Sequence, residues 1–206
     1  MKKKIGEEYI ELTKYENMPV KVHEVLNRKP PPVRIECRDV EKFTDLPVPE
    51  KFSDNGISLR DAISRRRSFR EYSGQPVTQE ELSYLLWATQ GIRKIAVDNS
   101  TLRTVPSAGA CHEFETFMLI NNVAKLEKGL YWFLARERKL AKIRTGEDIS
   151  RRFTDACLGQ EFVNKSAVTF AWVAVAERMT WRYGQRGVQV YPDRCGTHMS
   201  ESISFS

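Results

Sequence analysis

The sequence has few of the residues on which metal and disulfide sites depend. Its 206 residues include four cysteines and three histidines, and they form neither a CxxC pair nor an HExxH motif. This argues against a disulfide framework, a zinc knuckle and a zinc-protease site. Cys195 and His198 have a spacing that suits two metal ligands, but no second pair accompanies them. We therefore expect no metal site.

Glycine-rich phosphate loops and long hydrophobic runs are also missing. The eleven glycines form neither GxGxxG nor GxxxxGK[ST], so side chains would have to hold any bound phosphate. The longest nearly apolar run, Ala167 to Ala176, is about half of the ~20 residues that a helix needs to cross a bilayer. Lys2, Lys3 and Lys4 are followed by acidic residues instead of the apolar stretch of a signal peptide. These features predict a cytoplasmic protein without membrane contact.

The composition is that of an ordinary globular chain, with 41% hydrophobic and 29% charged residues. The formal net charge of +6 favours anionic partners, without deciding between polymers and small phosphates. Nucleic-acid binding through the basic runs 2–4 and 65–67 is a lower-ranked alternative, because no helix-turn-helix or RRM signature is present.

Local patterns predict an α+β fold, in which a mostly antiparallel central sheet lies between helices. Residues 1–56 are rich in proline and lack a sustained period, so we interpret them as an arm without its own fold. Helices are predicted to begin at Ser58, three residues before Asp61, and at Thr78, three residues before Glu81. An apolar stripe is expected on the first helix, at Leu59, Ala62 and Ile63.

The second half of the chain contains strand signals. Residues 114–120, 130–134 and 140–143 are predicted strands, and the last two form a hairpin around a charged turn. Residues 148–158 are a predicted helix closed by Gly159. The run from Ala167 is predicted to be a strand buried on both faces.

The strongest chemical feature is the arginine cluster Arg65-Arg66-Arg67-Ser68-Phe69-Arg70. In an extended segment, Arg66, Ser68 and Arg70 would share one side, where two forked donors and a hydroxyl suit a terminal phosphate. The alternative is a solvated helix end whose arginines complement the helix dipole. The residues alone leave both interpretations open.

The cluster and the residues after it resemble the FMN-dependent nitroreductase family. The similarity includes Glu71-Tyr72, the helix start at 76–82 and the segment Pro106-Ser107-Ala108-Gly109-Ala110. The stretches 86–91 and 103–110 look like the SagB-type dehydrogenase subgroup, which includes azoline oxidases, and further matches lie at Glu115-Thr116, 129–131 and 182–184.

The resemblance implies a three-layer α/β/α fold, a homodimer and FMN between the subunits. It further implies that Arg66, Ser68 and Arg70 hold the FMN phosphate and ribityl chain, with Arg67 contributing through its backbone. Pro106, Ser107, Ala108 and Gly109 would form the loop along the flavin ring. The flavin would carry hydride from NAD(P)H to an electron-poor acceptor of the nitro or quinone type or to a peptide azoline, and no catalytic protein acid or base is expected.

The resemblance is predicted to end after Gly187. We therefore expect a nitroreductase-like domain at 57–187 that is incomplete at its C-terminal side, and a divergent tail at 188–206. Loss of a covering helix would expose the apolar run from Ala167 and weaken both dimerisation and FMN binding. An inactive remnant or interaction protein of this fold is the main alternative to an active enzyme.

Overall fold

The computed structural model describes residues 5–12, 14–17, 27, 29–32, 35, 40–49, 56–96 and 100–189. The basic run 2–4 and the residues Cys195 and His198 lie outside this part. The helices and strands are α1 (Ile5–Leu12), β1 (Lys42–Asp45), α3 (Leu59–Arg65), α4 (Gln79–Gln90), β2 (Ile92–Ile95), β3 (Thr101–Arg103), β4 (Phe114–Ile120), β5 (Gly129–Leu134), β6 (Lys139–Arg144), α5 (Ile149–Ala156), α6 (Phe162–Lys165), β7 (Val168–Ala174) and α7 (Ala176–Tyr183). Short 3₁₀ turns are η1 (Tyr15–Asn17), η3 (Ala108–Ala110) and η4 (Gly184–Gln189).

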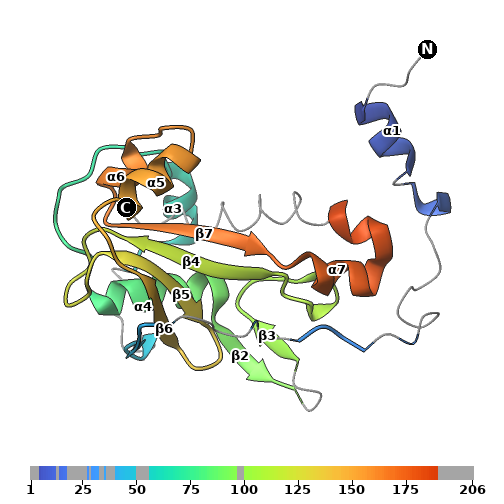
Figure 1. Ribbon diagram of the computed structural model, residues 1–206, viewed down its shortest axis with the longest axis horizontal. Coiled ribbons are helices and arrows are strands. Elements are labelled where there is room, and N and C mark those ends of the chain that lie inside the picture. The colour runs from blue at the N-terminus through green and yellow to red at the C-terminus, as the bar shows by residue number, and fades with distance from the viewer. Residues whose placement is uncertain are drawn as a thin grey trace.

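Five strands form the central sheet in the order β1-β6-β5-β4-β7, and every neighbouring pair is antiparallel. Helix α4 lies on one face of this sheet, and α5 and α6 lie on the other (Figure 1). Strands β2 and β3 form a separate antiparallel pair. The expected α+β fold with three layers and a mostly antiparallel sheet is therefore confirmed.

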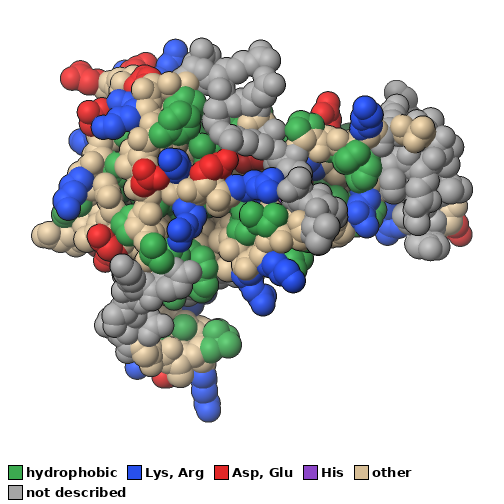
Figure 2. All heavy atoms as spheres, turned by 90° about the horizontal axis from the view of Figure 1, so that it is seen from below, with side chains coloured by type: hydrophobic (Ala, Val, Ile, Leu, Met, Phe, Trp, Pro, Cys, Tyr) green, Lys and Arg blue, Asp and Glu red, His purple; other side chains and the backbone are tan. Residues whose placement is uncertain are grey.

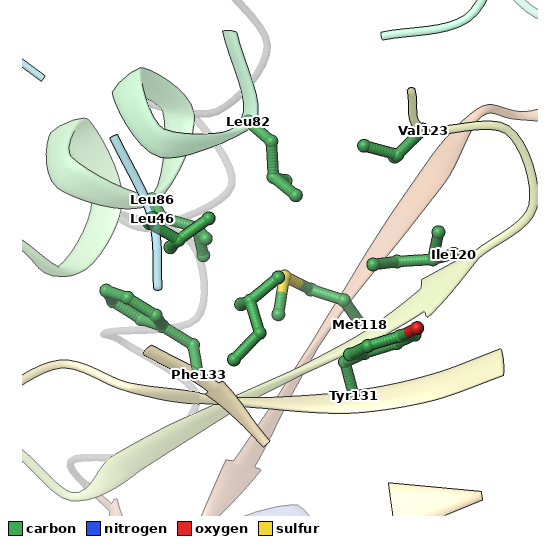
Figure 3. Packing of buried hydrophobic residues seen from close by; sticks show 9 residues of the cluster. Leu46, Leu82, Leu86, Met118, Ile120, Val123, Tyr131 and Phe133 are labelled. Carbon is green, nitrogen blue, oxygen red and sulfur yellow. The ribbon is translucent and has the colours of Figure 1, made fainter. Parts of the chain in front are cut away.

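Strict alternation along the strands builds a core on each face of the sheet. Met118 and Ile120 of β4 point toward Leu82 and Leu86 of α4, in the cluster drawn in Figure 3. Leu119, between them in sequence, points to the opposite face and packs with residues of α5 and α6. Because side chains alternate along a strand, one seven-residue segment serves both hydrophobic layers.

The helix starts predicted at Ser58 and Thr78 are confirmed, including their capping hydrogen bonds. The Ser58 hydroxyl accepts a hydrogen bond of 3.1 Å from the Asp61 N–H. At Thr78 the capping box is complete, since its hydroxyl accepts from the Glu81 N–H and the Glu81 carboxylate accepts from the Thr78 N–H. The predicted strands at 114–120, 130–134 and 140–143 and the helix before Gly159 are also present.

Three expectations need correction. Strand β7 is not buried on both faces: among the described strands it is an edge strand beside β4, its first five residues are partly exposed and its last two are exposed. The predicted apolar stripe of α3 is not packed, and Leu59 and Ile63 are 77% and 68% exposed. The arm at 1–56 supplies β1 to the edge of the sheet and Leu46 to its core, so it does more than lie over the domain. No helix in the described ranges is long and apolar enough to cross a membrane.

Candidate functional site

The arginine segment leaves the helix where the sequence predicted. Helix α3 ends at Arg65, and Arg66 has φ −53° and ψ 123°, which turns the chain away from helical geometry. Arg66, Ser68 and Arg70 are all exposed. Within the described part of the chain, none of them is paired with a carboxylate, and the Arg70 guanidinium lies 5.7 Å from the centre of the Phe162 ring. These side chains are accessible to an anion.

The second predicted element, at 106–110, is a tightly wound loop before β4. The Ser107 hydroxyl accepts a 2.7 Å hydrogen bond from the His112 N–H and lies 3.5 Å from a Glu113 carboxylate oxygen. Gly109, Ala110 and His112 have φ values of 59°, 54° and 43°. Ala110 and His112 have a Cβ, so this left-handed backbone is strained, and such strain gathers at functional sites.

Helix α7 packs directly against this loop. A Cβ on Gly109 would lie 2.4 Å from Arg182 Nε and 2.8 Å from the Tyr183 hydroxyl. Segments 106–110 and 182–184 are therefore in contact, although they are far apart in the chain. The space beside Gly109 that a side chain would need is filled by α7, which explains the glycine without reference to any ligand.

A buried ionic network holds α7 and the loop together. Arg178, which is 4% exposed, donates to Glu115 Oε1 at 2.5 Å and to the His112 carbonyl at 2.8 Å. The Trp132 indole N–H donates to the other Glu115 oxygen at 3.1 Å. His112 Nε2 lies 2.7 Å from the Thr101 carbonyl; a carbonyl only accepts, so this nitrogen carries the proton.

Arg103 lies next to this network and bonds Gln90 Oε1 at 2.6 Å. Burial lowers the pKa of the Arg103 guanidinium to about 10; Glu115 and Glu113 oppose this shift, and Arg178 adds to it. Arg103 is still protonated at neutral pH. A positive charge therefore persists behind the loop.

The two predicted halves of the site lie at opposite ends of the same strands. Arg70 contacts Phe162 of α6, which precedes the start of β7, and that start pairs with Ile120. The 106–110 loop precedes Phe114, which pairs with the other end of β7. A seven-residue strand is about 20 Å long, so one chain does not bring the two halves together.

Sequence reasoning missed the network of Arg103, Glu113, Glu115 and Arg178. Glu115 lies in a segment that resembles the family, but no functional role was predicted for it. The sequence did contain one signal for this network: Glu113 and Glu115 are carboxylates at the start of a mostly apolar strand. Buried carboxylates need a cationic or hydrogen-bonding partner, but the sequence does not indicate which of its 33 basic residues supplies one.

Comparisons with known proteins agree on one family. The model described as "Nitroreductase family" matches residues 63–200 and so extends beyond Gly187. A protein of Methanocaldococcus jannaschii that bears the name nitroreductase is 31% identical over 147 residues, 71% of each chain.

Two solved structures that bear the same name share the fold. The structure from Anabaena variabilis is 27% identical with a TM-score of 0.53, and the match covers 69% of this chain but 28% of that one. The structure from Ralstonia eutropha has a TM-score of 0.61 at 23% identity, covering 80% of this chain and 70% of that one. The matched part of the present chain therefore covers little more than a quarter of the Anabaena chain.

Proposed function

The chain belongs to the nitroreductase family, and from this premise we propose that it is an FMN-dependent oxidoreductase of the SagB type. It would transfer hydride between NAD(P)H and an electron-poor acceptor, either a nitro or quinone-type compound or a peptide azoline. The observation that carries the proposal is the exposed set Arg66, Ser68 and Arg70, which has the donor chemistry of a phosphate site and no carboxylate partner among the described residues.

The residues fit the phosphate end of FMN. Two guanidinium groups present forked N–H donors that match phosphate oxygens, and the Ser68 hydroxyl adds a third donor. An anion bound here would relieve the repulsion between neighbouring arginines. The preceding Arg65 ends α3, so the segment is anchored on a capped helix.

The loop at 106–109 fits the ring end. Small side chains leave its peptide groups accessible, and the Ser107–His112 hydrogen bond with the Gly109 contact to α7 fixes the course of the chain. A bound flavin supplies hydride transfer at its N5 atom. The residues of this chain would bind the phosphate, orient the ring and exclude water, and we assign no protein acid or base.

We also propose a homodimer, and the separation of the two halves supports it. In a two-fold dimer the Arg66–Arg70 segment of one subunit can meet the 106–109 loop of its partner, which makes two identical sites. The region around the arginines supports such an interface, because its large hydrophobic side chains are 45–77% exposed: Ile57, Leu59, Ile63, Phe69 and Tyr72. An apolar cluster of this kind is typical of an interaction surface.

A visible spectrum tests the function directly. After incubation with FMN and desalting, the protein should stay yellow, and anaerobic NADH or NADPH should bleach the colour. Retained colour without bleaching by either donor would indicate a flavin-binding remnant. A folded protein that retains no flavin would contradict the proposal.

A further inference from the structure

One cavity has a lining that includes none of the predicted flavin-binding residues at 66–70 and 106–109. It has a volume of about 300 Å³ and lies between the C-terminal end of α4, strand β2 and the turn that joins β5 to β6. Its apolar wall includes Trp87 and Phe133, and its rim includes the four cations Arg93, Lys94, Arg136 and Arg138. Among the residues that the structure describes, no acidic residue lines it. Figure 2 shows the molecule from below the view of Figure 1, and on this face Lys and Arg side chains lie beside hydrophobic ones.

An irregular strand forms one side of this cavity. Five consecutive residues, Gly91 to Ile95, line it, and Arg93 and Lys94 are among them. The pairing of β2 with β3 shifts between Ile92 and Lys94, so Arg93 is the extra residue of a bulge. Bulges redirect side chains and are common beside binding sites.

The opposite rim is also built on an unusual backbone. Arg138 has φ 51°, a left-handed conformation that is uncommon for a residue with a Cβ. This turn is tied to the wall, because its Arg138 carbonyl accepts a 3.1 Å hydrogen bond from the Leu46 N–H. Glu137, between the two arginines in sequence, is not part of the lining.

Within the described residues, the four cations lack the carboxylate partners that other cations near the sheet have. Lys139 pairs with Asp45, and Lys142 pairs with Glu41 and Glu127. Across the ranges that the structure describes, no carboxylate lies within ion-pair distance of any of the four rim cations. Unneutralised charge around a hollow attracts an anion.

The aromatic wall is held in place from several directions. The Trp87 carbonyl accepts hydrogen bonds from the Gly91 N–H and the Thr104 hydroxyl. Nearby, the Ser83 hydroxyl donates to the Pro47 carbonyl at 2.6 Å. Trp87 is 37% exposed, so part of its surface is available to a ligand. The cavity is therefore a preformed space, as small-molecule sites usually are.

We propose that this cavity binds a small organic anion of one or two rings, with the rings against Trp87 and Phe133 and a carboxylate, sulfonate or phosphate among the four cations. The volume of the cavity limits the size of the ligand. About 300 Å³ is at the lower end for ligand sites and is too small for a whole dinucleotide. The proposal does not depend on flavin binding.

The test uses 5-(dimethylamino)naphthalene-1-sulfonate, an aromatic sulfonate of two fused rings whose fluorescence rises in apolar surroundings. It should bind with a stoichiometry near one per chain, and Arg93→Gln with Lys94→Gln should weaken binding by about tenfold or more. Arg136→Gln should also weaken it. The uncharged analogue 5-(dimethylamino)naphthalene-1-sulfonamide should bind the native protein more weakly and respond little to these substitutions.

The matched control is Arg151→Gln with Arg152→Gln, which removes the same charge from exposed positions on α5. This variant should keep the native affinity. Unchanged sulfonate binding in the Arg93 and Lys94 variant would overturn the proposal. An equal loss in the α5 control would also overturn it, because net charge alone would then explain the effect.

Discussion

Replacing Arg66 and Arg70 together with alanine should weaken FMN binding by several kcal/mol, which corresponds to at least about a hundredfold rise in Kd. Each guanidinium would make a charge-assisted contact with the phosphate, and such contacts contribute roughly 1.5 to 3 kcal/mol apiece. Quenching of FMN fluorescence on titration with the protein measures the change. Ser68→Ala should cost less, roughly 0.5 to 1.5 kcal/mol, because its hydroxyl is neutral.

The chain provides a matched control for this result. Arg65→Ala with Arg67→Ala also removes two positive charges from the cluster. These two arginines lie outside the set that would face the phosphate. Arg65 is the last residue of α3, and Arg67 is expected to contribute through its backbone, which alanine keeps. FMN affinity should therefore change little. Equal losses in the two double variants would show that the cluster acts as diffuse charge and would remove the specific roles.

Combining two defective chains tests whether the site is shared between subunits. Gly109→Ala should disturb the ring loop, since its Cβ would collide with Arg182 at a φ of 59°. Purified heterodimers of this chain with the Arg66→Ala, Arg70→Ala chain would hold one site without defects. They should bind about half of the native amount of flavin, whereas each variant homodimer should bind little. A site built within one chain would give no recovery.

The sequence patterns that predicted the structure correctly involve residues close together in the chain. Ser58 with Asp61, and Thr78 with Glu81, form caps from residues three positions apart, so the pattern contains the whole interaction. The strand at 114–120 was evident because β-forming residues fill it and Asn121 follows it. The exposure of β7 was not evident, because it depends on which strand lies beside it.

In the candidate site, too, local patterns could be predicted from the sequence and long-range contacts could not. The alternation of Arg66, Ser68 and Arg70 is a local property that could be read directly. The contact of Gly109 with Arg182 joins residues that are distant in sequence, and so does the bond between Glu115 and Arg178. A resemblance marks such segments as important together, but only packing tells which atoms meet. The β2 bulge is equally invisible, since a one-residue shift in pairing leaves no mark in the composition.

Removing the buried guanidinium of Arg178 should have the largest effect on stability. Arg178→Ala leaves the Glu115 carboxylate buried without its cation and frees the His112 carbonyl, and breaking a buried pair in this way costs about 3 to 5 kcal/mol. Urea unfolding followed by tryptophan fluorescence measures the change. Arg152→Ala, which breaks an exposed pair with Asp148, should cost less than about 1 kcal/mol.

A double replacement separates the charge from the packing. Arg178→Met with Glu115→Leu removes both ions and leaves no unpaired charge, so it should be more stable than Arg178→Ala alone. A double variant at least as unstable as the single one would mean that Arg178 acts mainly through the His112 carbonyl. The ring loop would then depend on α7 for its shape, and flavin retention should fall in both variants even at temperatures where they stay folded.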